Sequence, residues 1–427
     1  MEKYGAVKIF FGSRWNILVS KPEYLNKIFK NEHIFQKSGN QKKIPYSVLA
    51  AYTGDNVISA HGAEWVKYRN IVKDGLQHFD NGILQRNSIL LCKLLERQLF
   101  NQGHNIVQII PFIQKLTLDN ICQIGLGFDF RALKDARNEL HLELTEIKKK
   151  IFHPFYLNFP FFDKLPIPSR LDAFADVKSF RNKLVDKVKE NLGRTNRFNK
   201  SNSVGAGLLR AHYDGELTEK QLADNIVIIL VAGHENPQLF FSNLVYLLGK
   251  YPRWQVTLRQ ELKIMENYSD LQYLPLLNAF FYEALRFLPP LSVIINRKTS
   301  IKVHIGDNVV IPKGCYVGYH NFGTTHDKKY WGENADQFLP ERWGDNIEQI
   351  TKRWKISKNN CTMNTFHGGK RICLGEKMVL TAGRIFICDL LKTFQWELDP
   401  SWQERMTQAG PLCPHDLRIQ LKLIGGN

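Results

Sequence analysis

Cysteines are few in this sequence, and no two of them stand in the CxxC spacing of a zinc site. The seven cysteines are widely spaced and odd in number. They therefore argue against a disulfide framework and against a structural zinc site. A reducing compartment fits such a chain best. The cysteines are Cys92, Cys122, Cys315, Cys361, Cys373, Cys388 and Cys413.

Long hydrophobic runs are also missing. A helix that crosses a bilayer needs about 20 apolar residues, whereas the longest apolar run starts at Ile226 and reads only IVIILVAG. No signal peptide opens the chain. The first residues instead predict a turn and two strands, Val7–Phe11 and Trp15–Ser20. The sequence thus begins like the middle of a domain.

Acidic residues are in short supply relative to basic ones. The chain has 58 Lys and Arg against 41 Asp and Glu, a formal charge of +17. Such a charge favours an acidic partner: nucleic acid, an anionic membrane surface or an acidic protein. The basic residues are dispersed, with short runs such as Lys148–Lys150, so a solvated face explains them equally well. A nucleic-acid binder would cluster them among aromatic residues, which disfavours that class.

The sequence also has no internal repeat and no low-complexity linker. Helical periodicity dominates from about Trp65 to Lys298. Short strand signals and a loop-rich stretch, Asn321–Thr365, follow, and a last long helix is expected from about Leu374 to Thr393. The pattern predicts a mainly α fold with a small β region. No point resembles a domain boundary, so residues 1–427 are expected to form one large domain.

Two segments stand out within this pattern. NIVIILVAGHENPQLFFSNLVYLL, from Asn225, is apolar nearly all round and predicts a buried central helix. Between Ile151 and Pro168 the chain is rich in aromatic residues and proline, and we expect it to be too irregular for a helix. Two interpretations of that segment stay open: a packed loop, or an apolar surface that dips into a membrane or lines a substrate entrance.

The stretch NTFHGGKRICLGEK surrounds one cysteine, Cys373, with basic and glycine residues. A lone cysteine is commonly a small buried hydrophobe, but this loop could also stabilise a thiolate. Arg371 brings positive charge, and Gly369 and Gly375 let the backbone approach the sulfur or a flat ligand. Phe366 could pack against a ring. One thiolate without partner ligands suits haem, whose macrocycle fills four positions around the iron.

The spacing Phe366-x-x-Gly369-x-Arg371-x-Cys373-x-Gly375 resembles the haem-binding loop of the cytochrome P450 family. The resemblance covers essentially the whole chain. It implies one large, mainly helical domain with a buried haem b and Cys373 as the axial ligand of the iron. It also implies an NADPH- and O2-dependent oxidoreductase. A haem-binding sensor without catalysis is the alternative from another class.

Further motifs of the family occur in the same order along the chain. YEALR carries Glu283 and Arg286, which share one face of a helix, and PERW carries Arg342. In the family these residues form a buried network, which implies a structural role in holding the cysteine loop. EWVKYR carries Trp65 and Arg69.

The same resemblance implies a set of haem contacts. Trp65 and Arg69 match the helix of the family that meets a haem propionate. Arg297 and Arg371 lie where the family places two further propionate contacts. Several arginines beside a dianionic cofactor make chemical sense.

The central helix departs from the family at AGHENP. The family usually has an acid followed by threonine at the oxygen site; here Glu235 keeps the acid and Asn236 replaces the alcohol. An amide relays protons less well than a hydroxyl. Pro237 cannot donate to the carbonyl of Gly233, so we expect a kink and an open groove there. Alternatively, a bound water does the work of the threonine and Asn236 is a neutral replacement.

Within the family, GNQKKIPYS, AAYTGDNVIS, HNFGTTHD and AGPLCP resemble the yeast sporulation-specific members. This group implies oxidative coupling of N-formyl-tyrosine to N,N′-bisformyl dityrosine for the ascospore wall. The missing alcohol at Asn236 fits a reaction that inserts no oxygen. The alternative is a monooxygenase that hydroxylates another small aromatic or lipophilic substrate. By the layout of the family, we expect substrate contacts from Lys43–Asn56, Phe152–Phe162, Leu291–Ile294 and Gly410–Pro414.

The resemblance also implies partners and a location. Electrons would come from NADPH through a reductase with an acidic docking face, which the positive charge suits. The basic residues expected on that face are Lys352, Arg353, Lys355, Lys358, Lys370 and Lys377. Eukaryotic members carry a membrane anchor and a proline-rich hinge, which this sequence lacks. We therefore expect the full-length protein at the cytosolic face of the endoplasmic reticulum membrane, and this chain alone could be soluble.

Other motifs add little. GLGFDF, from Gly125, lacks the third glycine of a dinucleotide fingerprint. His234 and His367 are expected to make local hydrogen bonds and not to bind a metal.

Overall fold

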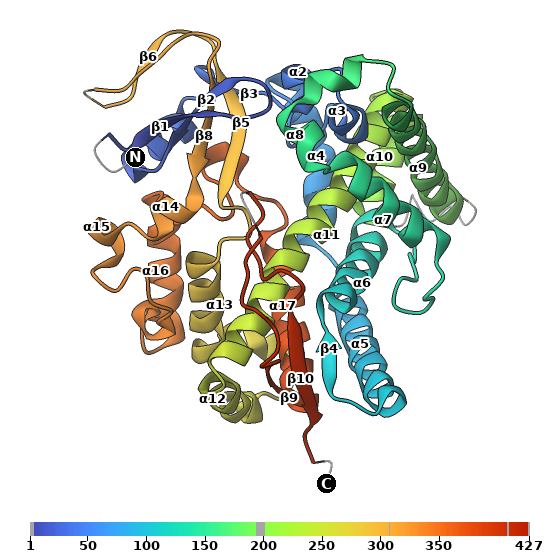
Figure 1. Ribbon diagram of the computed structural model, residues 1–427, viewed down its shortest axis with the longest axis vertical. Coiled ribbons are helices and arrows are strands. Elements are labelled where there is room, and N and C mark those ends of the chain that lie inside the picture. The colour runs from blue at the N-terminus through green and yellow to red at the C-terminus, as the bar shows by residue number, and fades with distance from the viewer. Residues whose placement is uncertain (1–3, 194–200, 307, 408–409, 426–427) are drawn as a thin grey trace.

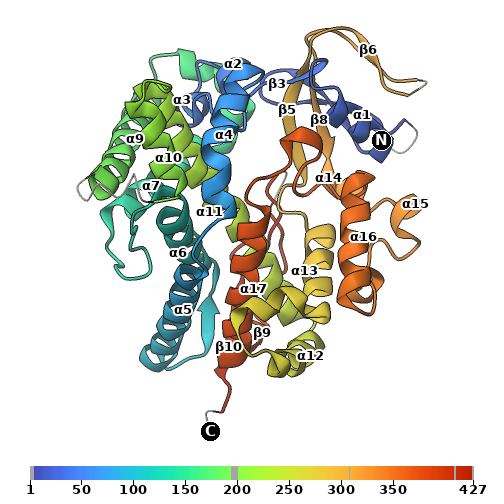
Figure 2. The same cartoon turned by 180° about the vertical axis from the view of Figure 1, so that it is seen from behind.

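The helix α11 (Glu219–Lys250) runs through the middle of the molecule (Figures 1 and 2). On one side of it lie the helices α5, α6, α7 and α9, and on the other lie α13, α16 and the largest sheet. This computed structural model describes residues 4–193, 201–306, 308–407 and 410–425. It confirms the predicted fold, mainly helical with a small β region.

The sequence of α11 explains why it forms and where it lies. Thr218 caps its first turn and exchanges two hydrogen bonds with Gln221 in a capping box. Most of its side chains are apolar and buried, as expected for a core helix. The helix continues through Pro237. It packs on α6 (Ile110–Ile121) so closely that a Cβ atom at Gly233 would lie 2.1 Å from Cγ1 of Ile121.

The strands form three sheets. The largest has the order β1-β2-β8-β5-β3, with β2 and β8 parallel and the other pairs antiparallel. Its strands are β1 (Ala6–Phe10), β2 (Trp15–Val19), β3 (Phe35–Lys37), β5 (Val293–Thr299) and β8 (Tyr316–His320). The smaller sheets contain β4 (Ile106–Gln108), β10 (Arg418–Leu423) and β9 (Phe394–Leu398), and β6 (Val303–His304) with β7 (Val310–Ile311).

The remaining helices surround α11 and the sheets. The longer ones are α4 (Ala63–Gln77), α5 (Asn81–Gln102), α7 (Glu139–Ile151), α9 (Pro168–Gly193), α10 (Val204–Tyr213), α13 (Pro275–Phe287), α16 (Ile347–Asn359) and α17 (Glu376–Thr393). The shorter ones are α1 (Pro22–Lys30), α2 (Asn40–Lys43), α3 (Val48–Thr53), α8 (Pro154–Asn158), α12 (Arg253–Glu261), α14 (Asn321–Thr325) and α15 (Lys328–Trp331).

The aromatic segment between Ile151 and Pro168 differs from its prediction. It is not irregular throughout: α8 and a 3-10 turn, η2 (Pro160–Lys164), interrupt it. Both begin with proline at their first position, where the missing N–H has no helical partner and the fixed φ suits a helix. The prolines taken as helix breakers therefore start these two turns.

Two hydrophobic clusters make up the core. The larger surrounds α11 and extends to α5, α6, α9, α13 and α17. The smaller lies between α1 and the five-stranded sheet and includes Phe29 and Tyr319. The loop that carries Cys373 lies between the two clusters, because Phe366 belongs to the larger cluster and the ring of His367 packs on Phe29.

The structure also bears on the expectations for the cysteines and for a membrane-spanning helix. All seven cysteines are free thiols. Within the described residues, no helix is long and apolar enough to span a membrane.

Candidate active site

A cavity of about 320 Å³ lies between α11, the Cys373 loop and the end of β5. Such a volume is in the range of small-molecule sites. The residues around it are mostly apolar, with polar groups gathered toward one end. The apolar ones include Val57, Ile58, Val72, Leu76, Ile121, Ile228, Ile229, Ala232, Phe240, Leu291, Ile294 and Val379.

Cys373 faces this cavity. Its side chain is exposed there, while its backbone N–H donates to the carbonyl of Phe366 across 2.9 Å and closes the loop. Gly375 is the N-cap of α17. Although Cys373 is open to the cavity, the protein around the cavity desolvates the thiol and raises its pKa, whereas the N–H groups of Gly375 and Glu376 and the charge of Arg69 lower it. The loop therefore offers the thiolate both amide donors and a positive charge.

Gly369 shapes the loop through its backbone. Its φ is +64°, a conformation that favours glycine. A Cβ atom there would also lie 2.9 Å from the carbonyl oxygen of Phe29. The glycine thus lets the loop lie directly against the end of α1.

A cluster of cations occupies the polar end of the cavity. Arg69, Arg371 and Lys37 line it, and Arg297 lies beside them. Lys37 and Arg297 are directly opposite each other in the pairing of β3 and β5, and both are buried. Like charges in such a position destabilise a sheet unless an anion compensates. Burial, Arg297 and Arg371 lower the pKa of Lys37 well below its usual value.

Several donors in this cluster have no hydrogen-bond partner among the described residues. They include Nε of Arg297, Nη1 of Arg371 and the hydroxyl of Tyr319, all buried. Lys37 Nζ lies 3.1 Å from Nε2 of His367. Glu32 neutralises one cation, because it accepts from Nε of Arg371. Buried donors are normally satisfied, so the cluster fits a ligand with more than one negative charge, as haem has in its propionates.

Trp65 on α4 provides a flat apolar surface at the same place. The guanidinium of Arg371 lies 3.9 Å from its ring centroid, and that of Arg69 lies 5.5 Å away. These cation–π contacts orient both arginines. Arg69 also donates to the carbonyl of Ile372, across 3.3 Å, next to Cys373.

Glu283 and Arg286, buried on α13, form a network with Arg342 of the 3-10 turn η6 (Pro340–Trp343). Arg286 donates to both carboxylate oxygens of Glu283, at 2.9 and 2.8 Å, and Arg342 Nε donates across 2.9 Å. The indole of Trp343 and the backbone N–H of Leu339 also donate to Glu283. Because Glu283 and Arg286 are fully buried, this set of partners is what makes their charges tolerable.

The network connects to the cysteine loop through α13 and α16. The hydroxyl of Thr365 donates to the carbonyl of Leu285 across 3.2 Å. Trp354 stacks on Tyr282 with centroids 4.3 Å apart and meets the edge of Phe366. The position of the loop thus depends on the helix that carries Glu283.

On α11, Gly233 and Asn236 line the cavity, but Glu235 does not. The Glu235 carboxylate pairs with Lys148 of α7 at 2.7 Å and with Nε2 of His234 at 3.2 Å. Burial raises the pKa of Glu235, but His234 and Lys148 outweigh it and lower the value to about 2. Gly233 is packed on Ile121, so the space beside it is partly filled.

The structure brings most of the predicted cofactor residues to one cavity. Trp65, Arg69, Phe366, Arg371 and Cys373 line it together with Gly375. Sequence reasoning did not identify Lys37 and Asn296, which also line it, and gave His367 only local hydrogen bonds. The sequence offered one signal for Lys37, a charged residue within a strand. This signal was insufficient because Arg297, its neighbour in the sheet, is distant in sequence.

The expected substrate segments are placed unequally. Leu291 and Ile294 line the cavity, as predicted for Leu291–Ile294. Val57 and Ile58 line it just beyond the predicted Lys43–Asn56. No residue of Phe152–Phe162 or Gly410–Pro414, all of them within the described part of the chain, is among the residues that line it.

A cysteine facing a cavity, a cation cluster with unsatisfied donors and a buried Glu–Arg network fit a haem-thiolate protein. The sequence profile described as Cytochrome P450 matches residues 1–423. The chain therefore belongs to the cytochrome P450 family, and it is a haem-thiolate oxidoreductase.

Curated relatives cover nearly the whole chain. Cytochrome P450-DIT2 of Saccharomyces cerevisiae is 56% identical over 98% of this chain and 86% of its own length. Cytochrome P450 monooxygenase xanG of Aspergillus fumigatus is 33% identical over 95% of this chain and 78% of its own. An 11-oxo-beta-amyrin 30-oxidase of Glycyrrhiza uralensis is 24% identical over 97% and 80%. Family membership alone thus leaves the substrate open.

Proposed function

We propose that this enzyme couples two molecules of N-formyl-tyrosine into N,N′-bisformyl dityrosine for the ascospore wall. The observation that carries the proposal is the 56% identity to Cytochrome P450-DIT2 over 98% of the chain, together with the resemblance to the sporulation-specific members. The cavity supports it, because its apolar lining suits phenol rings and its amides, Asn236 and Asn296, suit a formamide.

The cysteine loop and the cation cluster would hold the haem. Cys373 would bind the iron, and Trp65, Arg69, Arg297 and Arg371 would bind the propionates. When bound, the haem supplies the oxidising chemistry, with dioxygen and with electrons from NADPH. The backbone at Gly369 and Gly375 shapes the loop, and Phe366 packs beside the thiol.

The reaction balances without adding oxygen to the substrate. Each phenol loses one hydrogen atom, and one carbon–carbon bond forms between the two rings. Two electrons from the substrates and two from NADPH reduce dioxygen to two molecules of water. The product is therefore lighter than two substrates by two hydrogen atoms.

The residues of α11 would handle the protons of this reaction. Glu235 is the acidic residue of that helix next to the cavity-lining Asn236. Its carboxylate would have to break its ion pair with Lys148 or with His234 to reach the site. Asn236 presents an amide to the cavity in place of a hydroxyl, beside Gly233. We propose that the amide is tolerated here, and that it favours coupling over hydroxylation, because coupling inserts no oxygen; unchanged rate and product in Asn236→Thr would contradict this.

The electrons would reach the haem from an NADPH-dependent reductase with an acidic docking face. Five of the basic residues expected to meet it are exposed, and Lys358 pairs with Glu376 at 2.6 Å. The exposed ones are Lys352, Arg353, Lys355, Lys370 and Lys377. These residues lie on α16, in the Cys373 loop and at the start of α17, and Trp354 of α16 contacts Phe366 of that loop, which supports electron delivery from this side.

A membrane surface is the second proposed partner. Phe155, Phe159 and Phe161 are exposed together around α8 and η2. The tip between β1 and β2 continues this surface with exposed Phe10 and Trp15. The two elements are joined because Ser13 N–H donates to the carbonyl of Asn158. An apolar surface of this kind suits the endoplasmic reticulum membrane, where we place this enzyme.

The mass of the product tests the proposed function. The haem-loaded enzyme, a reductase and NADPH are incubated with N-formyl-tyrosine, and Cys373→Ala serves as the blank. We expect a dimer lighter than two substrates by two hydrogen atoms. A monomer heavier by one oxygen atom would make the enzyme a hydroxylase and overturn the proposal.

A further inference from the structure

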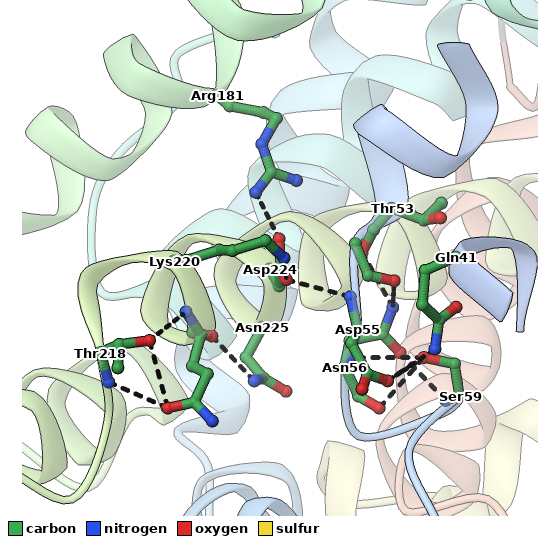
Figure 3. A network of polar contacts seen from close by, with 12 residues as sticks. Gln41, Thr53, Asp55, Asn56, Ser59, Arg181, Thr218, Lys220, Asp224 and Asn225 are labelled. Atoms are coloured by element: carbon green, nitrogen blue, oxygen red, sulfur yellow. Dashed lines mark hydrogen bonds and ion pairs between the residues drawn. The ribbon is translucent and has the colours of Figure 1, made fainter. Parts of the chain in front are cut away.

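One wall of the cavity is a loop without regular structure. It follows α3 and contains Val57 and Ile58, which line the cavity. A segment of this kind is ordinarily among the more mobile parts of a protein. Here the polar groups of residues 53–59 are tied down by a dense network (Figure 3).

Asp224 of α11 is the centre of this network. It is 1% exposed. Its carboxylate accepts from the backbone N–H of Asp55 at 3.0 Å and from Nζ of Lys220 at 2.7 Å. Arg181 of α9 also donates to it, and a second N–H of that guanidinium donates to the carbonyl of Tyr52 at 2.7 Å. Figure 3 shows Arg181 reaching Asp224 from above.

Asn225 continues the attachment one residue along α11. Its Oδ1 accepts from the backbone N–H of Val57 at 3.0 Å, and its Nδ2 donates to the carbonyl of Gln221 at 2.9 Å. Successive residues of α11 thus hold the backbone of Asp55 and of Val57. The hydrogen bond to Val57 acts directly on a residue of the cavity wall.

Gly54 makes this close approach possible. Its φ is +58°, and a Cβ atom there would lie 1.9 Å from Oδ1 of Asp224. Any side chain at this position would displace the carboxylate. The turn and the acid therefore depend on each other.

The loop also satisfies its own polar groups. Oδ1 of Asn56 accepts from the N–H groups of Ile58 and Ser59, at 2.9 and 3.2 Å. Oδ1 of Asp55 accepts from Gln41 at 2.6 Å and from the hydroxyl of Ser59 at 3.2 Å. Because three of these bonds are internal and Gln41 adds one from α2, the loop is held as one piece, and its attachment to α11 fixes where that piece lies.

We propose that Asp224 and Asn225 are positioning residues for substrate binding: they hold Val57 and Ile58 in place as a preformed wall of the cavity. Neither residue lines the cavity; both act through the loop. A preformed wall lowers the cost of ordering the site when a ligand binds. The proposal rests on the haem site and not on the proposed substrate.

The test compares two ligands of the haem iron that differ in reach. Imidazole binds the iron alone, whereas 4-phenylimidazole also places an aromatic ring against the apolar wall. Their binding is followed in the haem spectrum for the wild type, Asp224→Ala and Asn225→Ala. In both variants we expect 4-phenylimidazole to bind at least about fivefold more weakly, the size of one lost hydrogen bond, with imidazole affinity unchanged.

Hydrogen exchange supplies a second reading that needs no ligand. Faster exchange confined to the backbone of residues 54–60 is expected in both variants. Asp119→Ala is the matched control, because Asp119 is also a buried acid that accepts from two backbone N–H groups, those of Ala132 and Leu133. The control should lower stability without changing the ratio of the two ligand affinities.

Two results would overturn the proposal. One is an unchanged affinity ratio with unchanged exchange of residues 54–60 in Asn225→Ala, which decides the matter if Asp224→Ala fails to fold. The other is an equal change in the Asp119→Ala control, which would make the effect one of general stability.

Discussion

Lys37 and Arg297 stand opposite each other in the sheet, buried, with too few anions nearby. The sequence motif identified Arg297 and Arg371 as cofactor contacts, since their spacing is part of a known pattern. It could not identify Lys37, because the charge of that residue matters only through partners distant in the chain. At the residue scale, therefore, the cation cluster is understood from the tertiary structure, which pairs Lys37 with Arg297.

Lys37→Met is expected to have opposite effects on the two forms of the protein. Without haem, the lowered pKa of Lys37 means that its charge opposes folding near neutral pH, so the variant should melt at a higher temperature. With haem, a cation beside the propionates is lost, and haem should dissociate on the order of tenfold faster. Lys27→Met, at an exposed lysine on α1, is the control for both measurements, and a parallel change there would contradict the account.

Glu235 makes stability depend on pH. Its pKa in the folded protein is about 2, below the ordinary 4.5, so its contribution is present above pH 4.5 and is lost as the pH falls toward 2. Between pH 7 and pH 4 this loss amounts to about 1 kcal/mol.

Glu235→Gln should therefore lose about 1 kcal/mol less than the wild type in urea unfolding between these pH values. Glu146→Gln, at an exposed glutamate that pairs with Lys149 on the same helix as Lys148, should behave like the wild type. An equal pH dependence in Glu235→Gln and wild type would show that the ion pair is not formed in solution.

At the scale of elements, α11 was the most predictable part and the aromatic segment the least. The run from Asn225 is apolar nearly all round, and such a run has few alternatives to a buried helix. In the structure Thr218 caps this helix. The prolines between Ile151 and Pro168 were part of the reason to expect an irregular segment. Two of them instead stand at the first positions of α8 and η2 and begin these turns. The loop after α3 could not be placed from sequence, because the acid that holds it, Asp224, is far along the chain.

The contact of α11 with α6 gives a prediction at this scale. In Gly233→Ala the new methyl group would lie 2.1 Å from Cγ1 of Ile121, so the helices must separate or Ile121 must move. Overpacking of this kind costs about 1–3 kcal/mol, measured by urea unfolding. In a double-mutant cycle, Gly233→Ala should cost less stability in an Ile121→Ala background than in the wild type.

Gly193→Ala is the control for that experiment, since a Cβ atom there meets nothing within 4 Å. It should change stability by less than about 0.5 kcal/mol. If Gly233→Ala were as stable as this control, α11 and α6 would not pack as closely as the structure shows.

At the scale of the whole molecule, the formal charge is +17, but we propose a functional role, reductase docking, only for the basic residues on the side that contains α16. The basic residues of α16 lie far from α9, which also carries exposed lysines (Figures 1 and 2). Composition alone could not distinguish a docking surface from a solvated one. The fold supports the proposed docking surface, because α16 packs against the cysteine loop through Trp354 and Phe366.

Reversing the charge of residues on α16 should weaken binding of the reductase. Lys352→Glu with Lys355→Glu is expected to raise the KM for the reductase about tenfold or more at low salt, with less effect at high salt. Lys178→Glu with Lys187→Glu, on α9, changes the net charge equally and should leave this KM nearly unchanged. Equal effects of the two pairs would mean that net charge, and not a docking surface, matters.

The fate of molecular oxygen tests the central claim, coupling without oxygen insertion, most directly. N-formyl-tyrosine is incubated with the haem-loaded enzyme, a reductase and NADPH under oxygen-18 gas. The account predicts a dimer that contains no oxygen-18, with the label recovered in water. Oxygen-18 in the organic product would contradict it and identify a hydroxylation.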